Sequence, residues 1–171
     1  MPYRQLRILV EGNDDERFFE RIRTILEKKY DFIQTWKYQQ KTNKQVRNFL
    51  QSIKEMDSSY IFVKDINRAP CVTEKKQRIK RKYGRIDISN LIIVIKEIEG
   101  WYLAGLDDES CKELGLRLFS NTNDLTKEHF NNLIPNKFDS RIDFMVEVLK
   151  RFSLETAKQK NKSFSYFMSK I

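Results

Sequence analysis

The strongest constraint on the fold is an alternation between short apolar runs and longer segments with helical periodicity. The runs at Leu6–Val10, Tyr60–Val63 and Leu91–Ile95 have the length and β-branched content of buried strands, and Phe32–Tyr38 is expected to form another. Strands that alternate with helices form parallel sheets with helices packed on them, joined by right-handed crossovers. The sequence therefore predicts an α/β fold with a mainly parallel sheet of about four strands.

Helix signals occupy the segments between these runs. Asn13 followed by Glu16 resembles a capping box at the start of a first helix, and Asn43 is expected to cap a second. Each cap is followed by apolar residues at helical spacing, namely Phe18, Phe19, Ile22, Ile25 and Leu26 in the first helix and Val46, Phe49, Leu50 and Ile53 in the second.

The pattern changes after Glu99, where no further strand is evident. Helical segments are expected around Trp101, over Leu125–Ile134 and in later stretches, and few glycines or prolines mark a linker. We therefore expect an α/β domain over residues 1–106 and a helical C-terminal subdomain over residues 107–171 docked on it.

Composition narrows the class of protein. Cys71 and Cys111 are far apart without a C-x-x-C pattern, and His129 is the only histidine, so a zinc site is not expected and a reducing cytoplasm fits best. No apolar segment approaches the roughly 20 residues that cross a bilayer, so a soluble cytoplasmic protein without a membrane partner is expected. The net charge of +9 favours polyanions as partners, with ordinary solubility as the alternative explanation.

Acidic side chains follow the predicted strands at the points where they end. Glu11 follows the first strand, Asp65 the third, and Glu97 and Glu99 the fourth. Because the carboxyl ends of parallel strands meet at the edge where open α/β folds bind ligands, we expect these carboxylates to lie close together. Such a group persists if a cation neutralises it, if a basic side chain pairs with it, or if some members are protonated. Mg²⁺ is the natural cation for carboxylate oxygens.

Each acid also has a structural interpretation. Glu11 would cap the helix that follows, and Asp65 would start an Asx turn. Asp14 and Asp15 are expected in the first turn of the first helix, where negative charge is favourable. Glu97 and Glu99 would pair with surface lysines.

The segments "ILVEGNDDERFF", "IFVKDIN" and "IVIKEIEGWYLAG" resemble the three segments of a TOPRIM domain. TOPRIM is the metal-binding α/β module of topoisomerases, primases and OLD-type nucleases. The chain is most similar to small TOPRIM-like proteins whose final strand ends in a Glu-x-Trp-Leu-Leu-Ala pattern. The resemblance covers roughly residues 4–106, with a looser similarity at "KNKSFSYFMSKI".

This resemblance implies roles for individual residues. Glu11 matches the strand-end glutamate, to which acid–base work or metal binding is credited, and Asp65 matches the first aspartate of the family's Asp-x-Asp pair. Asn67 stands in place of the second aspartate, which removes one negative charge, and Glu99 would supply that charge. The implied function is phosphodiester hydrolysis on DNA or RNA with Mg²⁺ or Mn²⁺ held by these four residues, of which Glu11 and Asp65 are catalytic.

Two other functions compete with this interpretation. The chain would be a non-catalytic nucleic-acid or protein-interaction module if it kept the fold without sufficient metal chemistry, and Asn67 favours that alternative. A phospho-accepting receiver domain would use Asp14, Asp15, Asp65 and Lys96. We rank it low because Glu11-Gly12 intervenes between the strand end and the acidic pair, and no Lys-Pro dipeptide follows a late strand.

Basic residues crowd the stretch "TEKKQRIKRKYGR". The residues expected to bind nucleic-acid phosphates are Arg68, Lys75, Lys76, Arg78, Lys80, Arg81, Lys82 and Arg85. A solvated helix with Ile79 as its inward contact explains the same stretch equally well. No Walker-type motif is present, so an ATPase partner would be a separate chain, and a homodimer is a further partner prediction.

Overall fold

The computed structural model describes residues 2–171, and the chain divides into two compact units between Ile93 and Val94. The first unit is built on a four-stranded parallel sheet of order β2-β1-β3-β4. The strands are β1 (Gln5–Val10), β2 (Phe32–Lys37), β3 (Ser59–Asp65) and β4 (Leu91–Val94). The predicted α/β fold with a parallel sheet is therefore confirmed.

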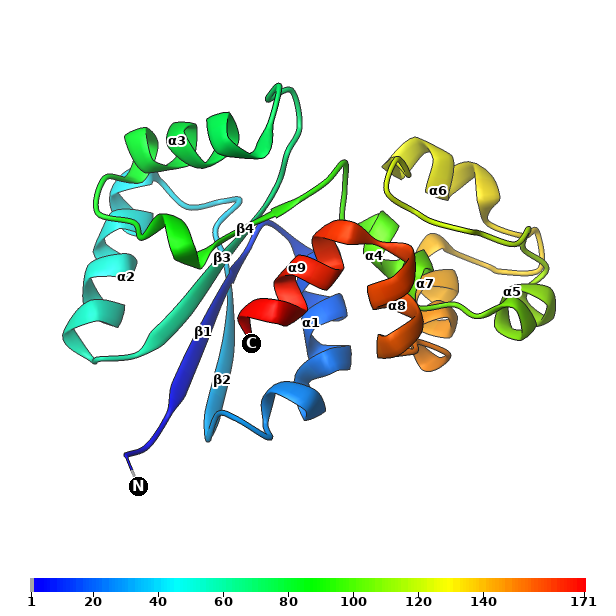
Figure 1. Cartoon of the computed structure of the whole chain (residues 1–171), viewed down its shortest axis with the longest axis horizontal. Helices are drawn as coiled ribbons and strands as arrows, with labels where there is room; N and C mark the ends of the chain where they lie inside the picture. The colour runs from blue at the N-terminus through cyan, green and yellow to red at the C-terminus, as the bar shows by residue number, and fades with distance from the viewer. Residues whose placement is uncertain (1) are drawn as a thin grey trace. The chain divides into compact units, whose positions relative to one another are not determined.

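Helices cover both faces of this sheet. They are α1 (Asn13–Leu26), α2 (Asn43–Glu55) and α3 (Val72–Tyr83), and a short 3-10 turn, η1 (Ile88–Asn90), leads into β4. In Figure 1, α2 and α3 lie on one side of the sheet and α1 on the other. Leu9 and Phe62 of the central strands pack against Leu50 of α2 and Ile79 of α3, and this core fixes where the ends of β1 and β3 lie.

Both predicted caps lie one residue earlier than the sequence pattern indicates. The N-cap of α1 is Gly12, whose amide donates to Asp15 at 3.2 Å. The N-cap of α2 is Thr42, whose side chain accepts from the Gln45 amide at 3.2 Å. The Thr42 hydroxyl satisfies an exposed amide of α2, whereas Gly12 has no side chain to do so and its own amide is satisfied by Asp15. The asparagines become the first helical residues.

The second unit is helical throughout, as predicted, and no strand follows Val94 in the described part of the chain. Its helices are α4 (Glu99–Ala104), α5 (Asp108–Leu114), α6 (Lys127–Leu133), α7 (Arg141–Lys150), α8 (Leu154–Lys160) and α9 (Lys162–Lys170). Trp101 anchors this unit: its indole donates to Ser163 at 2.8 Å, and its ring stacks on Phe167 with centroids 5.4 Å apart. None of the helices in residues 2–171 is long and apolar enough to span a membrane.

The division of the chain falls earlier than the boundary expected after residue 106. The reason is α4, which packs on α6, α7 and α8. The hydroxyl of Thr122 also donates to the carbonyl of Gly100 within α4 at 2.7 Å. The Glu-x-Trp segment consequently belongs with the C-terminal helices.

Candidate functional site

The carboxyl ends of β1 and β3 bring together carboxylates and a lysine. Glu11 directly follows β1, and Lys64 and Asp65 are the last residues of β3. Leu9 is in register with Phe62 across these parallel strands, so Glu11 and Lys64, each two residues further on, reach the same level. The Nζ of Lys64 lies 3.2 Å from Oε1 of Glu11. A basic side chain therefore compensates the predicted acidic edge.

Tyr38 is buried beside this ion pair. Its hydroxyl donates a 2.6 Å hydrogen bond to the carbonyl of Val63, and the Nζ of Lys64 lies 5.4 Å from its ring centroid. Burial raises the pKa of Tyr38 well above its ordinary value, and the negative charges of Glu11 and other nearby carboxylates raise it further. Tyr38 consequently stays protonated and continues to donate its hydrogen bond.

A second cation, Lys75 on α3, interacts electrostatically with the same carboxylates. Only 9% of Lys75 is exposed. Burial lowers the pKa of its ammonium group, the positive charge of Lys64 lowers it further, and Glu11 and Asp65 act in the opposite direction. We call Glu11, Lys64, Asp65 and Lys75 the strand-end cluster.

The donor set of the strand-end cluster suits Mg²⁺ in kind. Mg²⁺ is commonly held by one or two carboxylates, while water and substrate phosphates complete its octahedron. Glu11, whose side chain is 32% exposed, and Asp65 supply carboxylates from adjacent strands. Within residues 2–171, no group of three or more His, Cys, Asp or Glu side chains could hold a metal ion. A cation here would therefore rely on these carboxylates and on ligands from outside the chain.

Asn67 lies in an exposed turn after β3. The amide of Ala69 donates to the carbonyl of Ile66 at 3.2 Å and closes the turn, in which Asn67 has a φ of +51°. Asparagine and aspartate tolerate this left-handed conformation better than other residues with a Cβ. The turn thus gives a backbone reason for asparagine at this position. Arg68 is exposed in the same turn.

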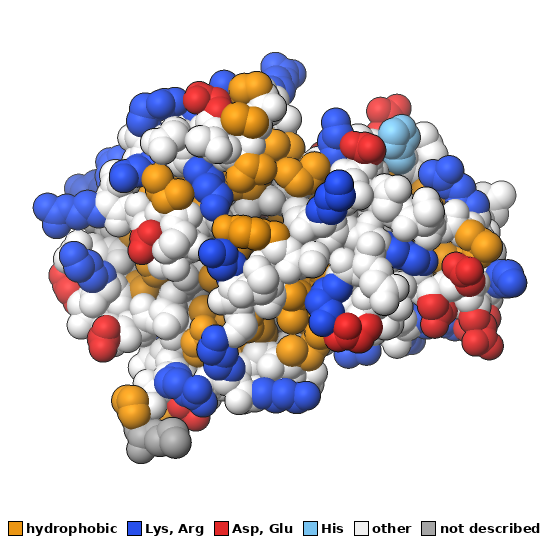
Figure 2. All heavy atoms as spheres, in the orientation of Figure 1, with side chains coloured by type: hydrophobic (Ala, Val, Ile, Leu, Met, Phe, Trp, Pro, Cys, Tyr) orange, Lys and Arg blue, Asp and Glu red, His pale blue; other side chains and the backbone are white. Residues whose placement is uncertain are grey.

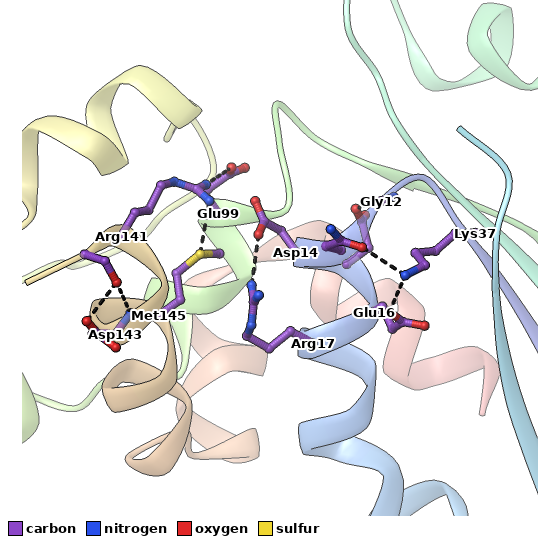
Figure 3. Close-up of polar contacts among 12 residues, drawn as sticks. Gly12, Asp14, Glu16, Arg17, Lys37, Glu99, Arg141, Asp143 and Met145 are labelled. Carbon is purple, nitrogen blue, oxygen red and sulfur yellow. Dashed lines mark hydrogen bonds and ion pairs between the residues drawn. The ribbon is translucent and has the colours of Figure 1, made fainter. Parts of the chain in front are cut away.

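Glu99 lies in the second unit, in the first turn of α4, and is 3% exposed. Nη2 of Arg141 on α7 donates to Oε1 of Glu99 at 2.6 Å (Figure 3). The same guanidinium donates to Asn131 at 2.8 Å and lies 5.4 Å from the ring centroid of Phe130. Glu99 is therefore the buried member of an ion pair that ties α4 to α6 and α7.

The acids at the start of α1 are engaged by their neighbours, as the structural interpretation expected. Asp15 accepts from the amide of the N-cap residue, and Asp14 pairs with Arg17 at 2.9 Å. Glu16 pairs with Lys37 of β2 at 2.8 Å (Figure 3). These contacts favour a structural role for this acidic run over a phospho-accepting one.

Most of the predicted phosphate-binding side chains are exposed on or beside α3. Arg68, Arg78, Lys80, Arg81, Lys82 and Arg85 are exposed, and Lys76 is half-buried. Figure 2 shows Lys and Arg side chains over the part of the surface formed by α2 and α3, with isolated acidic side chains among them. Glu74 pairs with Arg78 at 3.0 Å and with Arg81 at 3.2 Å. Lys75 differs from this set because it is buried.

A hollow of about 220 Å³ opens beside Glu11, between the start of α1 and the segment that follows β2. It is lined by Glu11, Gly12, Asn13, Lys37, Gln39, Gln40 and Lys41. Glu11 therefore borders both Lys64 and this hollow.

The sequence patterns missed two members of the site. They assigned no role to Lys64 or Tyr38, although a lysine directly before a strand-end aspartate is a visible signal. They also placed Lys75 among the exposed cations. Lys75 stands four residues before Ile79, the expected inward contact, so helical periodicity could have indicated its burial.

Comparisons with protein-family models, with curated proteins and with solved structures found no match to this chain. The similarity to TOPRIM domains stays a prediction from three sequence segments.

Proposed function

We propose that this chain binds nucleic acid and hydrolyses its phosphodiester bonds with Mg²⁺ or Mn²⁺ held by Glu11 and Asp65. The observation that best supports this proposal is the strand-end cluster, in which carboxylates that suit the metal adjoin ammonium groups that suit phosphate. The cluster occupies the edge where open α/β folds bind ligands. The resemblance to TOPRIM segments points to the same two carboxylates.

The acidic and the basic residues of the strand-end cluster would have different roles. A bound metal would polarise the phosphate and lower the pKa of an attacking water. Glu11 and Asp65 would hold that metal, while Lys64 and Lys75 would neutralise phosphate oxygens as negative charge develops on them. The exposed cations of α3 would bind neighbouring phosphates and position the strand.

A non-catalytic nucleic-acid-binding module is the second candidate. The 3.2 Å pair between Glu11 and Lys64 favours it, because a carboxylate that a lysine already neutralises needs no metal to be stable. Asn67 favours it as well, since an amide brings no charge to a metal site. The cluster would then stabilise the sheet edge, and α3 alone would contact the ligand.

Cleavage of labelled DNA and RNA in Mg²⁺, Mn²⁺ or EDTA tests the catalytic proposal. Glu11→Gln and Asp65→Asn preserve size and remove charge, and each should lower metal-dependent cleavage by about 10²-fold or more. Glu16→Gln is the matched control, because Glu16 also pairs with a lysine at this edge and should leave cleavage unchanged. Wild-type cleavage by both test variants would refute the assignment.

Binding in EDTA tests the second candidate and the role of α3. Replacing Lys80 and Lys82 with alanine should lower the dependence of log affinity on log salt by about 2, if both contact phosphates of a duplex. Lys28 and Lys29, which are exposed beyond the end of α1, provide a control with the same loss of charge. Full binding in EDTA without cleavage in either metal would favour the non-catalytic module. Equal losses in the two double variants would exclude α3 as the binding face.

A further inference from the structure

The strand-end cluster is close to electrically balanced before any ligand arrives. Glu11 and Asp65 contribute two negative charges, and Lys64 and Lys75 contribute two positive ones. A divalent cation that entered alone would leave an excess of two positive charges beside two ammonium groups. At distances of several ångström this repulsion is large in a partly buried site. A phosphodiester carries one negative charge, so one that entered together with the cation would halve this excess, and two neighbouring phosphates of a strand would cancel it.

Lys64 and Lys75 differ in their freedom to respond. The side chain of Lys64 is 21% exposed, and its contacts are the 3.2 Å pair with Glu11 and the face of the Tyr38 ring. A lysine side chain has a flexible stem that reorients easily. Lys75 is buried, so its side chain has less freedom to move. Lys64 can therefore leave Glu11 while Lys75 stays in place.

We propose that Lys64 couples metal binding to phosphate binding. Without ligand it is the counter-ion of Glu11, and it transfers to a phosphate oxygen when a divalent cation takes its place. The metal alone then binds weakly, because it must displace Lys64 without giving it a new partner. Metal and phosphodiester bind cooperatively, and each raises the affinity of the other by the same factor. This inference rests on the proposed metal site at Glu11 and Asp65 and adds how that site selects its ligands.

Calorimetry of Mn²⁺ binding tests the coupling without relying on cleavage. Mn²⁺ is titrated into the protein alone and into the protein saturated with a cleavage-resistant phosphorothioate oligonucleotide, and the heat of the oligonucleotide with Mn²⁺ is subtracted. The wild type should bind Mn²⁺ about fivefold or more tightly in the presence of the oligonucleotide. Oligonucleotide affinity measured with and without Mn²⁺ should change by the same factor.

Variants of Lys64 separate its charge from its packing. Lys64→Met, which keeps a long apolar side chain, should raise the affinity for Mn²⁺ alone about fivefold or more and reduce the coupling towards one. Lys64→Arg retains the positive charge and should retain the coupling. Lys37→Met is the matched control, because Lys37 pairs with Glu16 at 2.8 Å and its loss removes the same charge from the protein. It should leave both affinities for Mn²⁺ close to those of the wild type.

The outcomes distinguish this inference from the proposed function. Unchanged Mn²⁺ affinity in Lys64→Met, with binding still dependent on Asp65, would overturn the coupling and leave the metal site standing. An equal increase in Lys64→Met and Lys37→Met would also overturn it, since net charge alone would then explain the change. No Mn²⁺ binding by the wild type, with or without the oligonucleotide, would overturn both proposals together.

Discussion

Breaking the ion pair between Glu99 and Arg141 should destabilise the second unit by several times more than breaking an exposed ion pair. Glu99 is 3% exposed and accepts from Arg141 at 2.6 Å. A hydrogen bond to a charged group contributes roughly 1.5–3 kcal/mol, and the bond from Arg141 to Asn131 adds about 1 kcal/mol. We therefore expect Arg141→Met to cost about 3 kcal/mol. Glu99→Gln should cost about 1–2 kcal/mol, because the amide oxygen still accepts a hydrogen bond.

Urea unfolding followed by the fluorescence of Trp101 measures these losses of stability in the second unit of the chain. Trp101 is buried in the second unit, and Trp36→Phe removes the chain's other tryptophan, so the signal reports this unit alone. The double variant completes a thermodynamic cycle, for which we expect a coupling energy of about 1–2 kcal/mol between Glu99 and Arg141.

An exposed pair in the same unit gives the scale for comparison. Lys158 pairs with Glu155 at 2.7 Å, but the two side chains are 35% and 74% exposed, so Lys158→Met should cost under about 0.5 kcal/mol. A coupling between Glu99 and Arg141 no larger than this value would refute the argument from burial. If a fully folded Glu99→Gln protein lost affinity for Mn²⁺, Glu99 would have to be counted as a metal ligand, as the sequence predicted.

Three further perturbations test the packing and electrostatics of single positions. Gly105→Ala should cost about 1–3 kcal/mol in thermal unfolding, because a Cβ there would overlap the ring of Phe152. Burial raises the pKa of the Cys111 thiol. In the native protein at mildly alkaline pH, iodoacetamide should therefore modify the exposed Cys71 and should modify Cys111 only after unfolding. Peptide mass spectrometry measures both modifications. Hydrogen bonds from Ser89 lower the pKa of Asp87, so its contribution to stability is present above the ordinary aspartate pKa of about 3.9 and is lost as pH falls through the lowered value. Asp87→Asn should therefore weaken the acid dependence of urea unfolding.

The sequence predicted the strands because their apolar, β-branched runs depend on local residues alone. The end of the last strand was harder to predict from the sequence. The run from Leu91 continues to Ile95, but β4 ends at Val94. The amide of Ile95 donates to the side chain of Ser163 at 3.3 Å, and no local pattern reveals a partner 68 residues away. The helix caps lay one residue before the predicted asparagines because neighbouring glycine and threonine residues can also occupy an N-cap position.

The sequence could predict the site only to the extent that it predicted where the strands end. Alternation of strands and helices places Glu11 and Asp65 at one edge, but the pairing of Glu11 with Lys64 depends on β1 lying next to β3 in a particular register. The sequence contains no direct measure of that register. Glu99 shows the same limit, because Arg141, the side chain that engages it, is 42 residues further along the chain.

Acids at the end of a strand are therefore an incomplete description of a candidate metal site, because the cations that share the edge decide how those acids behave. Here the lysines come from a strand residue next to one acid and from the buried face of a helix. A site that is balanced without ligand has little affinity for a cation alone, and it has little affinity for a phosphate alone for the same electrostatic reason. Only a ligand pair with opposite charges enters without disturbing the balance. The coupling between metal and phosphate, rather than metal affinity by itself, is consequently the property that distinguishes a catalyst at this edge from a binding module.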